Sequence, residues 1–372
     1  MDRSRRKFFQ DSALGLFALS MGASCTTSIP SQSYPGKHKG YAWVALGSGP
    51  ESNILRRINL STYEYEEVLL PLGNAHAISK ISTHPDELFV YEFHGSAVRV
   101  NVKTGEILAR VDQTAELEFV GHGTYDPVRN IIWSSEKVGD LGLVRARSAD
   151  TMKLIPGKEF SFPGGHHVIR LPESSLISSA GSDPAGKHFI SFFDLSSLKI
   201  EKIVPTDYHG IHLYPLSSTE VISVSNQYTM DAERLRMTRR FTNPSTRKSM
   251  TPKDLEYAGT SPLLFADVSG QTKTFWDPSR TEIFHLGVGL DKVGTGNRFV
   301  TSHLLSHTVV VWKDFSPEKV ISVPYPLVVV ATLDGTEIVV QSEGFLRIYS
   351  VETGSLVKEI KYKQPVITLT KY

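Results

Sequence analysis

Histidine is the residue type whose distribution along this chain most suggests chemistry. The chain has 13 histidines. Five of them recur at intervals of 46, 45, 45 and 73 residues: His76, His122, His167, His212 and His285. A neutral imidazole is the commonest protein ligand for zinc, copper, iron and nickel. The first question is therefore which structural elements would bring residues so far apart in the sequence to one place.

Composition excludes several classes of protein. With 372 residues, 40% of them hydrophobic, the chain can bury a large core. Its 28 Gly and 20 Pro, with many β-branched residues, favour strands and turns. A single cysteine, Cys25, excludes zinc ribbons, ferredoxin-type clusters and disulfide scaffolds. The 40 basic and 39 acidic residues leave a formal charge of +1, so we expect no nucleic-acid partner.

The first 25 residues are typical of an export signal. Ser4-Arg5-Arg6-Lys7-Phe8-Phe9 matches the twin-arginine pattern, which an export receptor reads. The apolar run from Ala13 to Ala23 is too short to span a bilayer but fits the hydrophobic part of a signal peptide. We therefore expect a periplasmic protein of the bacterial cell envelope.

Cys25 leaves two forms of the mature protein open. It follows Gly22-Ala23-Ser24, where a cleavage site is expected, so it is a candidate for lipidation as the first residue of a lipoprotein. The alternative is simple cleavage near this point. Residues 26–39 are polar and broken by proline, which predicts a tether. We expect no other membrane span, so the membrane would be reached only through a lipid on Cys25.

A short repeated motif predicts the fold. Two or three apolar strand residues, a polar residue and a turn recur, as in Arg57–Thr62 and Arg99–Gly105. The polar positions are Asn59, Asn101, Arg147, Asp194, Asp267, Lys313 and Ser350. They are separated by 37 to 47 residues, except for one interval of 73 that fits an inserted loop. A period of roughly 40–47 residues with four short strands is typical of a β-propeller blade.

The number of repeats predicts a seven-bladed, all-β propeller over residues 40–372, of the WD40-like and YVTN-like kind. The first repeat, from Tyr41 to about Leu72, has no innermost strand of its own. The C-terminal run Pro365–Leu369 offers a spare strand. We expect that strand to complete the first blade and close the ring, which leaves no exposed sheet edge.

The predicted strand order gathers the histidines on one face. We name the strands of each blade a to d from the axis outward, and call top the face where strand a begins and the b–c loop lies. The five recurring histidines fall near the starts of a strands, and His166 and His209 lie beside such starts. His94, His303 and His307 fall in or beside b–c loops. Three others are placed elsewhere: His38, His84 and His188.

We therefore expect the top face, at the mouth of the central channel, to bind a ligand. The candidate binding residues are His76, His122, Glu136, His166, His167, His212, His285 and His303. Glu136 is expected in the b–c loop of the third blade, where it would add a carboxylate. If the ligand is an iron, copper or zinc ion, the candidate ligands are His122, His167 and His212. The alternative is that these histidines only brace blades, as Gly-His pairs do in WD-type propellers; Gly121-His122 and Gly165-His166 are such pairs.

The extra length in the fifth blade lies in its b–c connection, on the same top face. Residues 229–259 carry seven basic and four acidic side chains, a net charge of +3. A long loop in a compact repeat fold is usually functional or disordered. We interpret it as a basic lid, with Arg234, Arg236, Arg239 and Arg240 facing an anionic ligand or partner. A solvated excursion without function is the alternative.

Three short segments contain recurring histidines: Leu117–Tyr125, Gly210-Ile211-His212 and Phe284-His285-Leu286. In this order they resemble the aromatic-Gly-His-Gly, Gly-Pro-His and Arg-His-Leu segments of the DUF1513 family, whose members are twin-arginine-exported bacterial propellers of unknown function. Ser134-Ser135-Glu136 stands where the family has a Thr-Glu-Asn-like stretch, and Ser261–Asp267 is similar to its Pro-Ser-Leu segment. The resemblance adds Asn226 to the candidate binding residues. Gln227-Tyr228 depart from the family's Gly-Gly, and the blade around His167 is additional.

Three functions remain compatible with the sequence. We expect foremost a monomeric, non-catalytic binding protein for an unidentified ligand or envelope protein. The second is an enzyme on the same scaffold, either a lactonase-like hydrolase or a quinoprotein-like oxidoreductase. The third is an interaction platform that uses the basic insertion. The sequence has no nucleophile elbow, Walker motif or paired carboxylates, so no catalytic residue is assigned.

Overall fold

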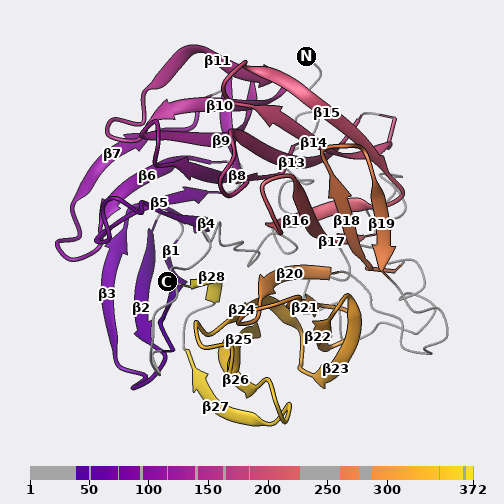
Figure 1. Ribbon diagram of the computed structural model, residues 1–372. Helices are drawn as coiled ribbons and strands as arrows, with labels where there is room; N and C mark the ends of the chain where they lie inside the picture. Colours follow the sequence, from indigo (N-terminus) through magenta and orange to yellow (C-terminus); the bar gives the residue numbers. More distant parts are fainter. Residues whose placement is uncertain are drawn as a thin grey trace, which may run out of the picture.

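Each sequence repeat folds into one four-stranded antiparallel sheet, and seven such sheets surround a common axis (Figure 1). The computed structural model describes residues 39–371 apart from 50–51, 74, 93–94, 115, 139–140, 162–164, 184, 227–259, 276–286, 343 and 363–365. Over these residues the regular structure consists of strands alone, and no segment forms a helix that could span a membrane. The predicted seven-bladed propeller is confirmed.

The first three blades contain the N-terminal half of the ring. Blade 1 consists of β28 (Val366–Lys371), β1 (Tyr41–Gly49), β2 (Ser52–Asn59) and β3 (Tyr65–Leu70). Blade 2 consists of β4 (Ala75–Lys80), β5 (Glu87–Glu92), β6 (Ala97–Asn101) and β7 (Ile107–Val111). Blade 3 consists of β8 (Leu117–Asp126), β9 (Ile131–Val138), β10 (Leu141–Ser148) and β11 (Leu154–Ser161). Within each blade the strands are given from the axis outward.

The remaining four blades complete the ring. Blade 4 consists of β12 (His167–Arg170), β13 (Leu176–Ser182), β14 (His188–Asp194) and β15 (Lys199–Thr206). Blade 5 consists of β16 (His209–Pro215), β17 (Glu220–Asn226), β18 (Leu263–Asp267) and β19 (Thr272–Phe275). Blade 6 consists of β20 (Gly287–Lys292), β21 (Arg298–His303), β22 (Thr308–Lys313) and β23 (Ser316–Ser322). Blade 7 consists of β24 (Pro326–Ala331), β25 (Glu337–Ser342), β26 (Phe345–Ser350) and β27 (Leu356–Lys361).

The two ends of the propeller meet in blade 1. The last strand, β28, pairs antiparallel with β1, with Val44 opposite Leu369 and Ala45 opposite Thr368. This is the predicted closure of the ring by the C-terminal strand. A second contact joins the start of the propeller to its last blade, because the Lys39 ammonium lies 2.6 Å from the Glu337 carboxylate of β25.

The repeated turn motif has a local cause. In blade 2 the side-chain oxygen of Asn101 accepts hydrogen bonds from the backbone N–H groups of Lys103 and Thr104, at 3.0 and 3.1 Å. The carboxylate of Asp194 does the same in blade 4 for Ser196 and Ser197. Asn and Asp favour such turns because their short side chains bond to the backbone two residues on. The motif therefore marks the turn from strand c to strand d.

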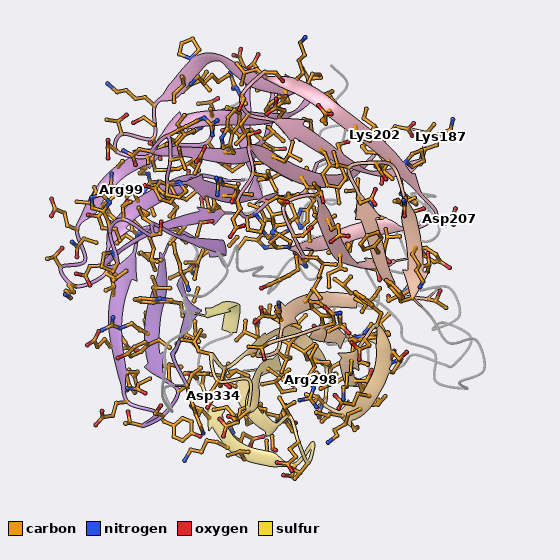
Figure 2. The ribbon with its side chains drawn as sticks, viewed as in Figure 1. Arg99, Lys187, Lys202, Asp207, Arg298 and Asp334 are labelled. Carbon is orange, nitrogen blue, oxygen red and sulfur yellow. The ribbon has the colours of Figure 1, made fainter. Side chains whose placement is uncertain are left out.

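The hydrophobic core lies between neighbouring blades. Trp133 of β9 and Phe160 of β11 contact each other with ring centroids 5.4 Å apart, and Phe160 contacts Phe193 of blade 4 at 4.8 Å. Similar buried clusters join each blade to the next. The outermost strands are more exposed, and Lys202 on β15 lies with Lys187 and Asp207 on the outside of the ring (Figure 2).

The innermost strands β4, β8, β16 and β20 each have an irregularity near their starts on the top face. The pairing register shifts at Ala75/Ala77 in β4, at Phe119/Gly123 in β8, at Gly210/His212 in β16 and at Gly287/Gly289 in β20. In β8 the bulge contains Gly121, whose φ of 107° is accessible mainly to glycine. Bulges redirect side chains, and these occur at or beside His76, His122 and His212.

Candidate functional site: a histidine cluster on the ring axis

Five histidine rings from four consecutive blades are in contact on the top face. His76 belongs to β4, His122 to β8, His212 to β16, and His166 and His167 lie at the start of β12. The ring of His122 is central, with ring centroids 4.6 to 5.2 Å from the other four. The predicted convergence of these histidines is therefore present in the structure. We call these five residues the histidine cluster.

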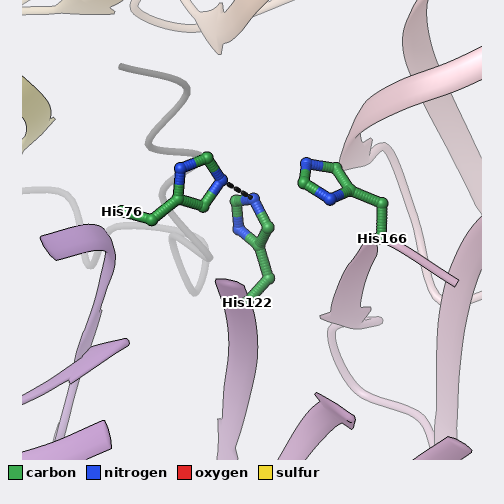
Figure 3. Close-up of side chains that lie close together, drawn as sticks. All are labelled: His76, His122 and His166. Carbon is green, nitrogen blue, oxygen red and sulfur yellow. Dashed lines mark hydrogen bonds between the residues drawn. The ribbon is translucent and has the colours of Figure 1, made fainter. Parts of the chain in front are cut away.

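Three of the rings bring nitrogens close enough to hold one metal ion. The ligand atoms of His76, His122 and His166 all lie within 4.8 Å of one another (Figure 3). The Nε2 atoms of His76 and His122 are 3.1 Å apart. In a tetrahedral zinc site with Zn–N bonds of about 2.1 Å, neighbouring nitrogens would be about 3.4 Å apart. The spacing of this pair is thus close to that required by a shared ion.

The ring of His212 is oriented by a hydrogen bond through Nδ1, which leaves the lone pair of Nε2 available for a metal ion. Its Nδ1 lies in hydrogen-bond contact with the backbone carbonyl of Val288 in blade 6. A carbonyl only accepts, so Nδ1 carries the proton and Nε2 carries the lone pair. That Nε2 atom is buried and has no hydrogen-bond partner among the described residues. A backbone carbonyl on one ring nitrogen is a common way to orient the other nitrogen toward a metal.

His167 is held in the opposite tautomer. Its Nδ1 accepts a hydrogen bond of 2.9 Å from the backbone N–H of Leu213 in blade 5. The neutral ring therefore carries its proton on Nε2 and can donate from that atom. A protonated Nε2 has no lone pair for a metal. The ring that was predicted as a ligand is thus a hydrogen-bond donor in this geometry.

Four rings of the cluster, those of His122, His166, His167 and His212, are neutral at pH 7. Burial first, and then the neighbouring imidazoles, hold the pKa of His122, His166 and His167 well below the usual range. Burial lowers the pKa of His212 to about 4, against the opposing effect of the Val288 carbonyl. A neutral imidazole keeps the lone pair that a metal ion needs.

Glu136 lies within strand β9 and not in the loop after it. Its two carboxylate oxygens accept hydrogen bonds from Arg147, at 2.6 Å from Nε and 2.8 Å from the second guanidinium nitrogen. Ser134 donates a further hydrogen bond of 2.6 Å. Both residues of the ion pair are buried. The structure therefore commits this carboxylate to a buried ion pair in blade 3.

Asn226 ends strand β17 and joins blade 5 to blade 6. Its side-chain nitrogen donates to the carbonyl of Gly287 at 3.0 Å, and its side-chain oxygen accepts from the Gly287 N–H at 2.9 Å. The hydroxyl of Ser261 contacts the same side-chain oxygen. A Cβ at Gly287 would approach Val224 Cγ2 to 2.4 Å, so this position needs glycine. The side-chain amide of Asn226 thus pairs with the Gly287 backbone as a neighbouring strand would, and clamps blade 5 to blade 6.

His303 lies on the top face at the end of β21, outside the cluster. Its Nε2 is 2.7 Å from the hydroxyl of Thr301, which accepts a hydrogen bond from the indole of Trp312 at 2.8 Å. The Thr301 hydroxyl can donate to this imidazole or accept from it, according to the tautomer of His303. His307, in the following turn, accepts the Tyr325 N–H on Nδ1 at 3.1 Å.

A second pair of histidines, His188 and His209, lies on the top face outside the cluster. His188 begins β14 and so lies at the top face, which corrects the prediction that it falls elsewhere. Its Nδ1 and that of His209 both lie 2.7 Å from the hydroxyl of Ser182. Ser182 is the last residue of β13, and a serine at the end of a strand gives no sequence signal for this role. His84 is exposed in the turn between β4 and β5, away from the top face as predicted.

Several predicted residues lie outside the described part of the chain. These are His285, His94, Cys25 and the arginines of the insertion, Arg234, Arg236, Arg239 and Arg240. The flanking strands β17 and β18 do place the insertion in the b–c connection of the fifth blade, as expected.

The comparisons with known proteins bear on the fold. No protein-family model matches the chain, and no curated protein matches it. Among solved structures, "Kuenenia stuttgartiensis Hydrazine Synthase" aligns with a TM-score of 0.61 at 9% identity, over 90% of this chain and 99% of that chain. The WD40 repeats of RRP9 align with a TM-score of 0.56 at 10% identity, over 86% of both chains. The structure of U3-55K aligns with a TM-score of 0.53 at 10% identity, over 76% of this chain and 80% of that chain. Similarity at this level of identity supports a WD40-like propeller and nothing about chemistry.

Proposed function

We propose that this protein binds a transition metal ion on the axis of the propeller through His76, His122 and His166. The observation that carries the proposal is the convergence of three imidazoles from three blades, with two Nε2 atoms 3.1 Å apart. A hydrogen bond between two ring nitrogens uses one proton and one lone pair. A metal ion accepts the lone pairs of both nitrogens, so two neutral rings can each contribute one bond to it.

Bracing of blades accounts for two residues of the cluster, His167 and His212, and not for the contact between His76 and His122. His167 and His212 each bond through Nδ1 to the backbone of the next blade. His122, by contrast, bonds to another imidazole. Burying the ring nitrogens of five neutral imidazoles removes their hydrogen bonds to water, which costs free energy. Coordination of a metal ion would offset this cost. The geometry therefore favours a metal-binding function over bracing alone.

The donor set favours an ion of intermediate softness. Three imidazole nitrogens suit zinc, copper, iron or nickel, whereas magnesium and calcium prefer oxygen ligands. The binding is proposed as non-catalytic, because the sequence assigns no nucleophile and no pair of carboxylates for acid–base chemistry.

The test is the metal content of the native protein. The chain should be exported, purified without a polyhistidine tag and measured by elemental mass spectrometry together with an absorption spectrum. We expect close to one equivalent of iron, copper or zinc. A metal-free protein that also fails to take up any of these ions in dialysis would overturn the proposal.

We also propose that this binding takes place in the cell envelope. The support is the Arg5-Arg6 export motif, the position of Cys25 and the resemblance to the DUF1513 family. Mass spectrometry of the mature N-terminus tests the first two points. A diacylated or triacylated Cys25 would establish a lipoprotein, a chain beginning beyond Cys25 would establish simple cleavage, and an intact Met1 would refute export.

A further inference from the structure

The proposed metal centre has an unbalanced charge. Its three protein ligands are neutral imidazoles, so a divalent ion would keep its full charge of +2. In the part of the chain that the structure describes, no Asp or Glu belongs to the ligand group. Glu136, the carboxylate that the sequence predicted at the binding site, forms an ion pair with Arg147, which neutralises its charge. A buried and uncompensated charge is costly, so the site favours an additional anion.

One imidazole of the cluster is prepared to hold such an anion. The Leu213 N–H occupies Nδ1 of His167 and fixes its proton on Nε2. This ring lies edge-on to the central ligand His122, with centroids 4.6 Å apart. No hydrogen bond joins its Nε2–H to a described residue. The donor therefore belongs to the cluster without serving another group.

His212 shows that this arrangement is specific to His167. The two residues occupy corresponding strands of adjacent blades, and each bonds through Nδ1 to the next blade. His167 meets an N–H, whereas His212 meets the carbonyl of Val288. The opposite backbone groups impose opposite tautomers. The Nε2 of His212 thus carries a lone pair, whereas the Nε2 of His167 carries a proton that it can donate.

We infer that the metal centre binds a small anion at an open coordination position and that the Nε2–H of His167 donates a hydrogen bond to it. This inference rests on the proposed function, since the anion is bound through the metal. Three protein ligands leave an open position on a four-coordinate ion. The donor then stabilises the anion beside two buried ligands, His76 and His122, and the half-buried His166.

The experiment uses cobalt(II) as the metal and azide as the anion. The full-length protein is loaded with Co²⁺, its metal content is measured, and azide is titrated while the visible absorption of the ion is followed. We expect a saturable spectral change in the wild-type protein. Isotope-labelled histidine adds a second readout, because nitrogen chemical shifts in the zinc-loaded protein report the proton on Nε2 of His167 and on Nδ1 of His212.

Two substitutions at one position separate the donor from the brace. In His167→Asn, the side-chain oxygen can still accept the Leu213 N–H, but nothing reaches the Nε2 position. In His167→Gln, the longer amide reaches that position and can still donate. We expect the Asn variant to keep its cobalt and to raise the azide dissociation constant at least about tenfold, and the Gln variant to restore much of the affinity. His209→Gln, on the same face but outside the cluster, is the matched control.

The outcomes distinguish this inference from the proposed function. If wild-type protein takes up cobalt and azide leaves the spectrum unchanged, the anion inference is wrong and metal binding stands. Equal azide affinity in wild-type and His167→Asn protein would refute the role of His167. A wild-type protein that takes up no metal would overturn the proposed function and this inference with it.

Discussion

The Nε2 atoms of His76 and His122 lie 3.1 Å apart although the two residues are 46 positions apart in the sequence. Each sits beside a bulge in the innermost strand of its own blade. The distance is therefore set by the angle between two blades and by two local irregularities. It is the relationship on which the proposed metal site depends.

Replacing His122 should remove the metal. His122 is the ring that contacts all others in the cluster, so His122→Ala should lower the bound metal by at least tenfold. In the wild-type protein, metal at about 100 times its dissociation constant should stabilise the fold by about 2.7 kcal/mol. Thermal denaturation with and without metal measures this shift. The control is His84→Ala, at an exposed turn, which should keep both the metal and the shift.

Replacing Glu136 should affect stability and not the metal. Glu136→Gln leaves the buried Arg147 without its carboxylate, which should cost about 3–5 kcal/mol of unfolding free energy. Urea denaturation measures this cost, and elemental analysis of the folded fraction should find the metal content unchanged. Glu159→Gln, whose exposed carboxylate pairs with Arg145, is the control and should cost little. A folded Glu136→Gln protein without metal would make the carboxylate a ligand after all.

Replacing Asn226 should loosen the junction of blades 5 and 6. Asn226→Ala removes two hydrogen bonds to the backbone of Gly287; the Gly287 N–H keeps the Ser261 hydroxyl as a partner, whereas the Gly287 carbonyl loses the Asn226 amide, at a cost of about 1–3 kcal/mol. Urea denaturation should show this loss, whereas the exposed Gln271→Ala should be neutral. An Asn226→Ala protein as stable as the wild type would refute the clamp.

Removing the C-terminal strand should open the ring. A chain ending at Tyr362 lacks β28 and exposes the free edge of β1. We expect a broad, non-cooperative unfolding transition and aggregation, because unpaired strand edges pair with other chains. A synthetic peptide of residues 364–372 added during refolding should restore part of the sharp transition. Sharp, reversible unfolding of the truncated chain would show that closure is dispensable.

Stability should fall as the solution becomes acidic, in part through His209. Burial first, and then the neighbouring His188, lower the pKa of His209 to about 4. In the unfolded chain the pKa of a histidine is about 6.5. Between these values the unfolded chain takes up a proton that the folded chain does not, so stability is lost as the pH falls from about 6.5 to 4.

The variant His209→Gln isolates this contribution. In metal-free protein its stability should decrease less steeply over that range, by up to about 1.4 kcal/mol per pH unit, and should match the slope of the wild type above pH 7. Denaturant titrations at several pH values measure the difference. Parallel curves for the two proteins between pH 6.5 and 4 would contradict the shifted pKa of His209.

The sequence by itself determined the fold and the face that carries the histidines. Seven turn motifs, most of them with an Asn or Asp that bonds to its own turn, count the blades, because this chemistry is local. Because neighbouring strands of a blade are antiparallel, the starts of all innermost strands lie on one face. Histidines that recur near these starts therefore lie on that face. The spare C-terminal strand predicts closure for the same reason, since an incomplete first blade needs a partner.

Only the tertiary structure decided the role of each residue. The sequence favoured His122, His167 and His212 as ligands, whereas the structure groups His76, His122 and His166 and gives His167 a proton in place of a lone pair. Whether Nδ1 meets an N–H or a carbonyl depends on the register of the next blade, which no local pattern encodes. The pairing of Glu136 with Arg147 and of Asn226 with Gly287 likewise depends on contacts between strands. Side-chain identity is local, but tautomers and partners follow from packing across blades.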